Sequence, residues 1–160
     1  MGSAGSRAAD GLGLGDALNL PFREGAFTHV NSFVTLPWLP IRRALRQIQR
    51  VLEPGGRLTL TVEGIGYWVQ NWRATRGFGR ARLGRIREWL GAWLMRNGLD
   101  WQLIPGLAGR LAGHTAFDTA TIARIVRGEG FDVEDCQILT EAAGRPRPIG
   151  LTATKRPDPR

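Results

Sequence analysis

The sequence predicts an α/β fold, and the order of elements between residues 15 and 64 carries that prediction. An apolar run from Phe27 to Leu36 is rich in Val, Phe and Thr, which favour strands, and Ile41 to Leu52 shows helical spacing of apolar residues. Glu53-Pro54-Gly55-Gly56 ends the helix, because proline cannot continue a backbone ladder and glycine accepts a left-handed turn. Arg57 to Glu63 then follows as a second strand. A strand, a helix and a strand in this order are the elements of a βαβ crossover.

The sequence of this stretch resembles that of the class I S-adenosylmethionine-dependent methyltransferases. In that family an acidic-Ala-x-x-Leu-Pro-Phe turn, a strand that begins with Phe, a helix and a Leu-x-Pro-Gly-Gly turn follow one another, and here these are Asp16 to Phe22, Phe27 to Leu39 and Val51 to Gly56. The resemblance implies an α/β, truncated Rossmann-like methyltransferase fold. Its central sheet would have four to five strands, in the family order 4-5-7-6, with flanking helices and a helical lid insertion.

The family's first βαβ unit, which carries its Gly-rich cofactor loop, has no counterpart here. Residues 1–10 hold no apolar run, and a complete domain would need about 200 residues. The glycines of residues 11–15 have the spacing of a nucleotide loop, but they follow small polar residues rather than a buried strand, which favours the end of the family's third strand. We therefore expect a fragment of a larger enzyme, with a disordered N-terminus at 1–10, a partial methyltransferase domain at 11–155 with a lid at 64–113, and a disordered tail at 156–160.

Composition predicts a soluble, cytoplasmic protein of one domain. The 160 residues are 42% apolar, and no apolar run reaches the roughly 18 residues that a membrane span needs. The one cysteine, Cys136, excludes an internal disulfide and fits a reducing compartment. We expect no metal site, because His29 and His114 are far apart in sequence and Cys136 has no partner at ligand spacing.

The positive charge is concentrated between residues 64 and 113. The chain has a formal net charge of +8, and this segment holds eight arginines against Glu88 and Asp100, together with five of the six tryptophans. Helical spacing predicts an amphipathic helix over Arg80 to Asn97, with an apolar stripe and an arginine face. Such an arginine face is usually a solvated surface, and an acidic substrate, an anionic lipid surface and RNA are the alternatives. We do not favour nucleic acid as a partner.

The last third predicts a helix and two strands. Asp118 or Thr119 is expected to cap a helix that ends at residues 128–130, followed by strands at Phe131 to Leu139 and Ile149 to Lys155. The two strands resemble the antiparallel hairpin that closes the family's sheet.

The resemblance also implies the site residues, with S-adenosyl-L-methionine as cofactor. Asp16 matches the carboxylate that accepts from the adenine amino group, and Ala17 matches the residue whose backbone N–H meets the ring. The alternative is that Asp16 only caps a turn, a role for which Asp is also suited. The end of the fourth family strand passes the cofactor's methionine end and corresponds here to Asn31, Ser32 and Phe33.

A lid rich in Trp and Arg suits a small-molecule acceptor that is partly apolar and carries negative charge. The lid residues in question are Tyr67, Trp68, Trp72 and Arg73. Candidates for a catalytic base are His114 and Glu63, although methyl transfer can also proceed by positioning alone.

Two hypotheses of different classes follow. The first is S-adenosylmethionine-dependent methyl transfer by a larger enzyme of which this chain is a part. The alternative is a non-catalytic remnant that acts as a binding or partner module. The strand from Phe27 would then be an exposed sheet edge carrying Phe33, Val34 and Leu36, to which residues 11–17 or a second copy of the chain could pair.

Overall fold

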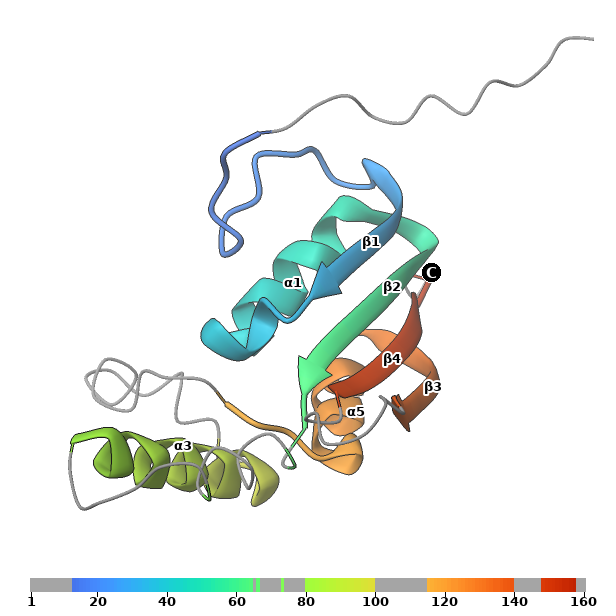
Figure 1. Cartoon of the computed structure of the whole chain (residues 1–160). Helices are drawn as coiled ribbons and strands as arrows, with labels where there is room; N and C mark the ends of the chain where they lie inside the picture. The colour runs from blue at the N-terminus through green and yellow to red at the C-terminus, as the bar shows by residue number, and fades with distance from the viewer. Residues whose placement is uncertain are drawn as a thin grey trace, which may run out of the picture.

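A four-stranded mixed sheet forms the centre of the protein (Figure 1). The computed structural model describes residues 13–64, 66, 73, 80–99, 115–139 and 148–157. The strands are β1 (Phe27–Phe33), β2 (Leu52–Glu63), β3 (Phe131–Ile138) and β4 (Pro148–Lys155), in the order β1-β2-β4-β3. The β1–β2 pair is parallel, and β4 is antiparallel to both β2 and β3. This arrangement confirms the predicted α/β fold and the order 4-5-7-6.

Two helices cover one face of the sheet, α1 (Ile41–Val51) and α5 (Thr119–Gly128). Side chains alternate along a strand, so Leu58, Leu60 and Val62 of β2 face these helices and are fully buried. They form one core with apolar side chains from α1, α5 and β4. The opposite face carries part-exposed threonines of β2 and β4, and no described helix covers it. The described part of the chain is therefore a two-layer structure with one open sheet face.

The strand from Phe27 is shorter than predicted, because the chain turns sharply at Val34. Val34 has φ of 52°, a left-handed conformation that is rare for a β-branched residue, and β1 ends at Phe33. The 3-10 helix η1 (Leu36–Trp38) follows, and Leu36 is buried in the core. The expectation that Leu36 lies on an exposed sheet edge was therefore wrong, whereas Phe33 is 74% exposed at that edge.

The turn predicted at residues 53–56 lies inside β2 rather than before it. The helix α1 ends at Val51, and Leu52 already pairs with Phe27 of β1. The next pair in the register is His29 with Arg57, so the four residues 53–56 of β2 lie opposite one residue of β1. This bulge accommodates the Pro-Gly-Gly sequence. Gly55 has φ of 77°, and a Cβ on Gly56 would come within 2.9 Å of the Glu53 carbonyl oxygen. Both glycines are thus required by the backbone.

The C-terminal elements follow the prediction closely. Asp118 caps α5, because its carboxylate accepts a hydrogen bond of 2.7 Å from the Thr121 N–H. The strands β3 and β4 form the predicted antiparallel pair. Arg156, the first residue of the expected disordered tail, donates to the carbonyl oxygens of Arg127 and Phe131 and pairs with Asp132. The hydrogen-bonded part of the chain therefore extends at least to this residue.

The helix α3 (Arg80–Arg96) has nearly the predicted bounds but not the expected orientation. Gly91 and Met95 are buried, and Met95 belongs to the core of the sheet and helices. The large apolar residues on the other side of α3 are exposed: Leu83, Ile86, Trp89, Leu90 and Trp93. Trp89 and Trp93 are each 49% exposed, so they do not belong to the core. Tertiary packing buries the side of α3 that carries Gly91 and Met95 instead.

Candidate functional site

The carboxyl ends of β1 and β2 meet at one edge of the sheet. Because the two strands are parallel, Phe33 lies beside Thr61, and the Val34 N–H donates a hydrogen bond of 2.9 Å to the Thr61 carbonyl oxygen. The left-handed turn at Val34 then directs the chain into η1 and away from this edge. Ligands of open α/β sheets bind outside the carboxyl ends of the strands, so this edge is the candidate site.

The three predicted residues at the end of β1 do not share one face. Ser32 pairs with Leu60, whose side chain faces the helices, so Ser32 lies on the covered face. Asn31 and Phe33 pair with Thr59 and Thr61 and lie on the open face, where both side chains are exposed. A ligand on the open face would therefore contact the side chains of Asn31 and Phe33 but only the backbone of Ser32.

Glu63 shares the open face with these two residues. It lies two positions after Thr61 on β2, at the same edge of the sheet, and its side chain is half-buried. Its carbonyl oxygen accepts a hydrogen bond of 3.1 Å from the Phe117 N–H, which ties the segment before α5 to the end of β2. The neighbouring Thr115 N–H donates to the Pro37 carbonyl oxygen of η1. Residues 115–117 thus connect η1 to the end of β2.

Asp16 forms a turn in the segment before β1. Its Oδ1 accepts a hydrogen bond of 2.8 Å from the Leu18 N–H, and its carbonyl oxygen accepts one from the Asn19 N–H. The turn role that the sequence left open is therefore present, while the carboxylate remains exposed beside the half-buried Ala17.

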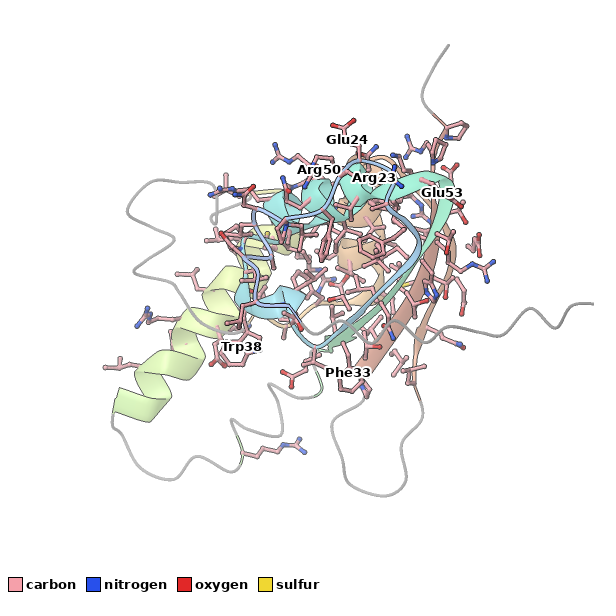
Figure 2. All side chains as sticks on the ribbon, turned by 90° about the horizontal axis from the view of Figure 1, so that it is seen from above. Arg23, Glu24, Phe33, Trp38, Arg50 and Glu53 are labelled. Atoms are coloured by element: carbon pink, nitrogen blue, oxygen red, sulfur yellow. The ribbon has the colours of Figure 1, made fainter. Side chains whose placement is uncertain are left out.

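The segment that carries this turn is held by α1. Arg50 donates hydrogen bonds of 2.7 Å to the carbonyl oxygens of Leu20 and Phe22, and Gln47 accepts one from the Leu20 N–H. Figure 2 shows Arg50 and Glu24 at the end of the molecule opposite Phe33. Asn31, Phe33 and Glu63 are thus gathered on one face and edge, and Asp16 with Ala17 belongs to a separate element.

The predicted lid residues are mostly outside the described part of the chain. Arg73 is described and exposed, whereas Tyr67, Trp68, Trp72 and His114 lie outside the described residues.

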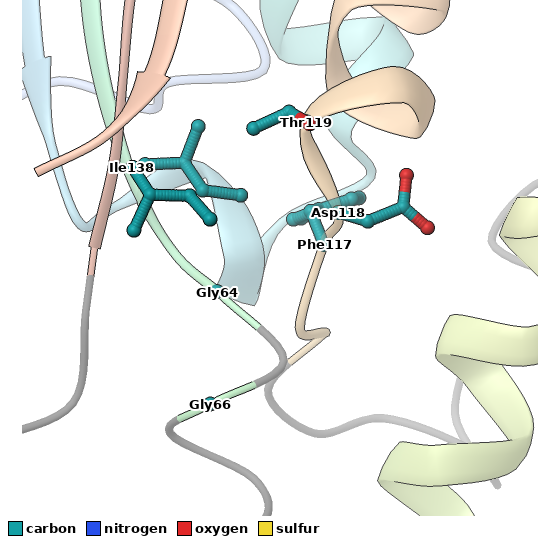
Figure 3. Close-up of a pocket in the computed structure, with 7 residues that line it drawn as sticks. Gly64, Gly66, Phe117, Asp118, Thr119 and Ile138 are labelled. Atoms are coloured by element: carbon teal, nitrogen blue, oxygen red, sulfur yellow. The ribbon is translucent and has the colours of Figure 1, made fainter.

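A pocket that the sequence did not predict lies where β2 and β3 end and α5 begins (Figure 3). Its volume is about 200 Å³. Gly64 pairs with Phe117 at its base, so the N-terminal end of α5 lies against the end of β2. Its lining is mainly apolar, and the residues are Gly64, Gly66, Phe117, Asp118, Thr119, Ile138 and Ile149. The signal that could have indicated it is the Gly64-x-Gly66 pair directly after a strand, because glycines leave room beside the backbone.

Comparison with known proteins agrees with this geometry. Residues 4–60 match the family described as a methyltransferase domain. The N-terminal part of this chain is thus similar in sequence to methyltransferase domains. A protein of Encephalitozoon cuniculi that is predicted to be a methyltransferase is 36% identical over 98 residues, which are 58% of this chain and 44% of that relative. The protein described here thus spans less than half the length of this relative.

Solved methyltransferases share the fold. A methyltransferase from Methanosarcina mazei superposes with a TM-score of 0.54 at 17% identity, over 90% of this chain and 66% of the other. The 1,6-didemethyltoxoflavin N1-methyltransferase of Burkholderia thailandensis superposes with a TM-score of 0.51 at 16% identity, over 83% of this chain and 45% of the other. That enzyme was solved with its substrate and S-adenosylhomocysteine bound. The similarity of these structures establishes the Rossmann-like methyltransferase fold.

Proposed function

We propose that this chain takes part in S-adenosylmethionine-dependent methyl transfer to a small-molecule acceptor. The observation that carries the proposal is the open carboxyl edge of the β1–β2 pair, in a chain whose residues 4–60 match a methyltransferase domain. The structural relative that holds S-adenosylhomocysteine supports the cofactor. Since the chain spans 44% of its relative from Encephalitozoon cuniculi, we assign the activity to a larger enzyme that includes it.

The chemistry of the exposed residues fits the cofactor. The exposed Asp16 carboxylate can accept from an adenine amino group, the Ala17 N–H is assigned to the adenine ring, and the Asn31 amide can both donate and accept. Phe33 offers an exposed aromatic ring at the same edge as Asn31. When bound, S-adenosylmethionine supplies a methyl group on a positively charged sulfur. The chain's own residues would hold and orient the reactants, which can supply much of the rate in such transfers.

The acceptor is assigned to the region after β2. The apolar pocket beside Gly64 would bury an apolar part of it, and Glu63 would hold the proton that an acceptor hydroxyl or amine releases. Arg73, which is exposed, would bind a negative group of the acceptor, together with the predicted lid residues Tyr67, Trp68 and Trp72. His114 stays the second candidate for the base.

Calorimetric titration with S-adenosylhomocysteine tests the proposal. We expect saturable binding, and Asp16→Asn should weaken it roughly ten- to hundredfold, because a hydrogen bond to a charged group contributes about 1.5–3 kcal/mol. Asparagine keeps the oxygen that accepts from Leu18, so it separates ligand binding from the turn. The matched control is Glu24→Gln, an exposed carboxylate on the same segment. If Asp16→Asn binds like the parent while Asp16→Ala does not, Asp16 serves only the turn.

A partner module is the second candidate function, and the edge position of β1 is the observation in its favour. β1 has one neighbour in the described sheet, and Phe33 beside its end is 74% exposed. An edge strand presents backbone groups to which another chain can pair. This function requires a stable oligomer that does not bind S-adenosylhomocysteine. A monomer in light scattering that binds this ligand excludes it.

A further inference from the structure

We infer that the outward face of α3 binds the surface of an anionic lipid bilayer, without crossing it. The proposed methyl transfer assigns no role to this face. One side of α3 packs against the protein, and the other side is apolar and bordered by arginines.

α3 is attached to the protein by its C-terminal half. Met95 is buried in the core, Gly91 is buried, and Leu94 packs against the core. Arg124 of α5 donates hydrogen bonds of 2.6 and 3.1 Å to the carbonyl oxygens of Met95 and Arg96 in the last turn of the helix, where carbonyl groups run out of helical partners. A cation at this position also interacts favourably with the helix dipole. The helix is thus held firmly while its other side faces outward.

The outward side is an apolar stripe. At 100° per residue, Leu83, Ile86, Trp89, Leu90 and Trp93 fall within one third of the helix circumference, opposite Gly91 and Met95. Their exposed fractions lie between 37% and 62%. The stripe is about 15 Å long, since it covers ten residue steps of 1.5 Å. A continuous exposed apolar stripe on a helix indicates a surface that is covered when the protein functions.

Charge flanks this stripe on both sides. The exposed Arg87 is adjacent to Leu83 and Leu90 on the helix surface. The exposed Arg96 is adjacent to Trp93 and also lies 3.8 Å from the Asp118 carboxylate. The sequence of α3 holds five arginines and one acidic residue, Glu88. Aliphatic and indole side chains with arginines at their borders are typical of helices that lie at the boundary of headgroups and acyl chains. Indoles prefer this boundary, and arginines reach anionic headgroups.

The same charges disfavour other occupants. A second copy docked through this stripe would bring two arginine-rich helices together, which costs electrostatic energy. RNA would use the arginines but gain little from Leu83, Ile86 and Leu90. No helix in the described ranges, α3 included, has the length and apolar content to cross a bilayer. An anionic membrane surface satisfies both the apolar stripe and its charged borders.

Co-sedimentation of the full 160-residue chain with vesicles tests the inference. We expect binding to vesicles of phosphatidylglycerol and phosphatidylcholine, and weaker binding when salt is raised, because salt screens exposed charges. Neutral phosphatidylcholine vesicles should retain far less protein. Equal binding to both kinds of vesicle, or to neither, overturns the inference.

Variants distinguish the contribution of the apolar stripe to vesicle binding from that of the protein's overall positive charge. Trp89→Ser with Trp93→Ser should lower vesicle binding at least about tenfold, because each indole contributes apolar contact at the interface. The matched control is Trp38→Ser on η1, a tryptophan that is 63% exposed and does not belong to the stripe. Arg87→Gln with Arg96→Gln should reduce binding only to the anionic vesicles, with Arg43→Gln on α1 as control. Circular dichroism verifies that each variant folds.

Undiminished vesicle binding in both double variants overturns the inference, as does retention by RNA or an acidic protein without vesicle binding. The assay contains no S-adenosylmethionine, so its outcome is independent of the proposed methyl transfer.

Discussion

At the residue scale, Arg50 has the most consequential side chain in the N-terminal part of the fold. Its guanidinium joins the carbonyl oxygens of Leu20 and Phe22 to Gln47 on its own helix. Such a planar group with several fixed donors is suited to bind two carbonyls at once. The segment with the Asp16 turn is therefore held mainly by Arg50, with Gln47 of the same helix accepting from the Leu20 N–H.

Replacing Arg50 by alanine should lower the free energy of unfolding by about 1–3 kcal/mol, because two charge-assisted hydrogen bonds are lost. Urea unfolding followed by circular dichroism measures this change. Arg43→Ala on the exposed side of the same helix is the control and should have little effect. Equal stability of the two variants would show that Arg50 does not hold the segment.

The thiol of Cys136 has a raised pKa, which can be measured through its reactivity. Burial raises the pKa of its thiol, the neighbouring Asp135 carboxylate raises it further, and the Arg127 guanidinium opposes them. Because the thiolate is the reactive form, a raised pKa means slower alkylation at any pH below it. We expect iodoacetamide to react more slowly with the folded chain at pH 8 than with the chain in urea, and the rate to rise with pH. Asp135→Asn should accelerate the folded reaction, and an unchanged rate would contradict the assigned cause.

At the element scale, the start of α5 combines a structural and a candidate binding role. The Asp118 carboxylate caps the helix through the Thr121 N–H and also lines the pocket beside Gly64. A cap of this kind satisfies one of the N–H groups that a helix start leaves without a partner. The position of the pocket wall is therefore coupled to the stability of the helix.

Asp118→Ala should cost about 1 kcal/mol of stability, the usual effect of losing an N-cap. Asp118→Asn keeps an oxygen for the Thr121 N–H and should cost much less. Thermal unfolding of the two variants measures the difference. Similar losses in both would show that the charge of Asp118, 3.8 Å from the Arg96 guanidinium, matters more than the cap.

At the scale of the whole molecule, the two faces of the sheet differ in function. One face is buried under α1 and α5, and the other presents Asn31, Phe33 and Glu63 at the candidate site. Neighbouring residues of β2 therefore have opposite roles, since successive side chains point to opposite faces.

Leu60→Ala should lower the free energy of unfolding by about 2–5 kcal/mol, because it leaves a cavity in the core. Leu60 is 0% exposed and lies in the strand that pairs with both β1 and β4. The adjacent Thr61→Ala, on the open face, should cost below about 1 kcal/mol. Chemical unfolding of both variants makes the comparison, and equal costs would mean that the open face is also packed.

The candidate site was predictable where it depends on strand order and not where it depends on turns. The family resemblance placed Asn31 and Phe33 at the edge that the structure also gives them, and period-two alternation separates them from Ser32. The left-handed turn at Val34 shortened the strand and buried Leu36, which no local pattern indicates. The pocket beside Gly64 joins residues that are far apart in sequence, so the Gly64-x-Gly66 pair is its one local signal and the other lining residues follow only from the fold.

Hydrophobic periodicity and the turn residues that the backbone requires predict most of the elements, and the resemblance to a known family predicts their order in the sheet. The covered side of each element depends on tertiary packing. On α3 both sides offer apolar residues, and close packing at Gly91 and Met95 left Trp89 and Trp93 exposed. The physical reason is that local propensity depends on near neighbours, whereas burial depends on the fit between surfaces that are far apart in the chain.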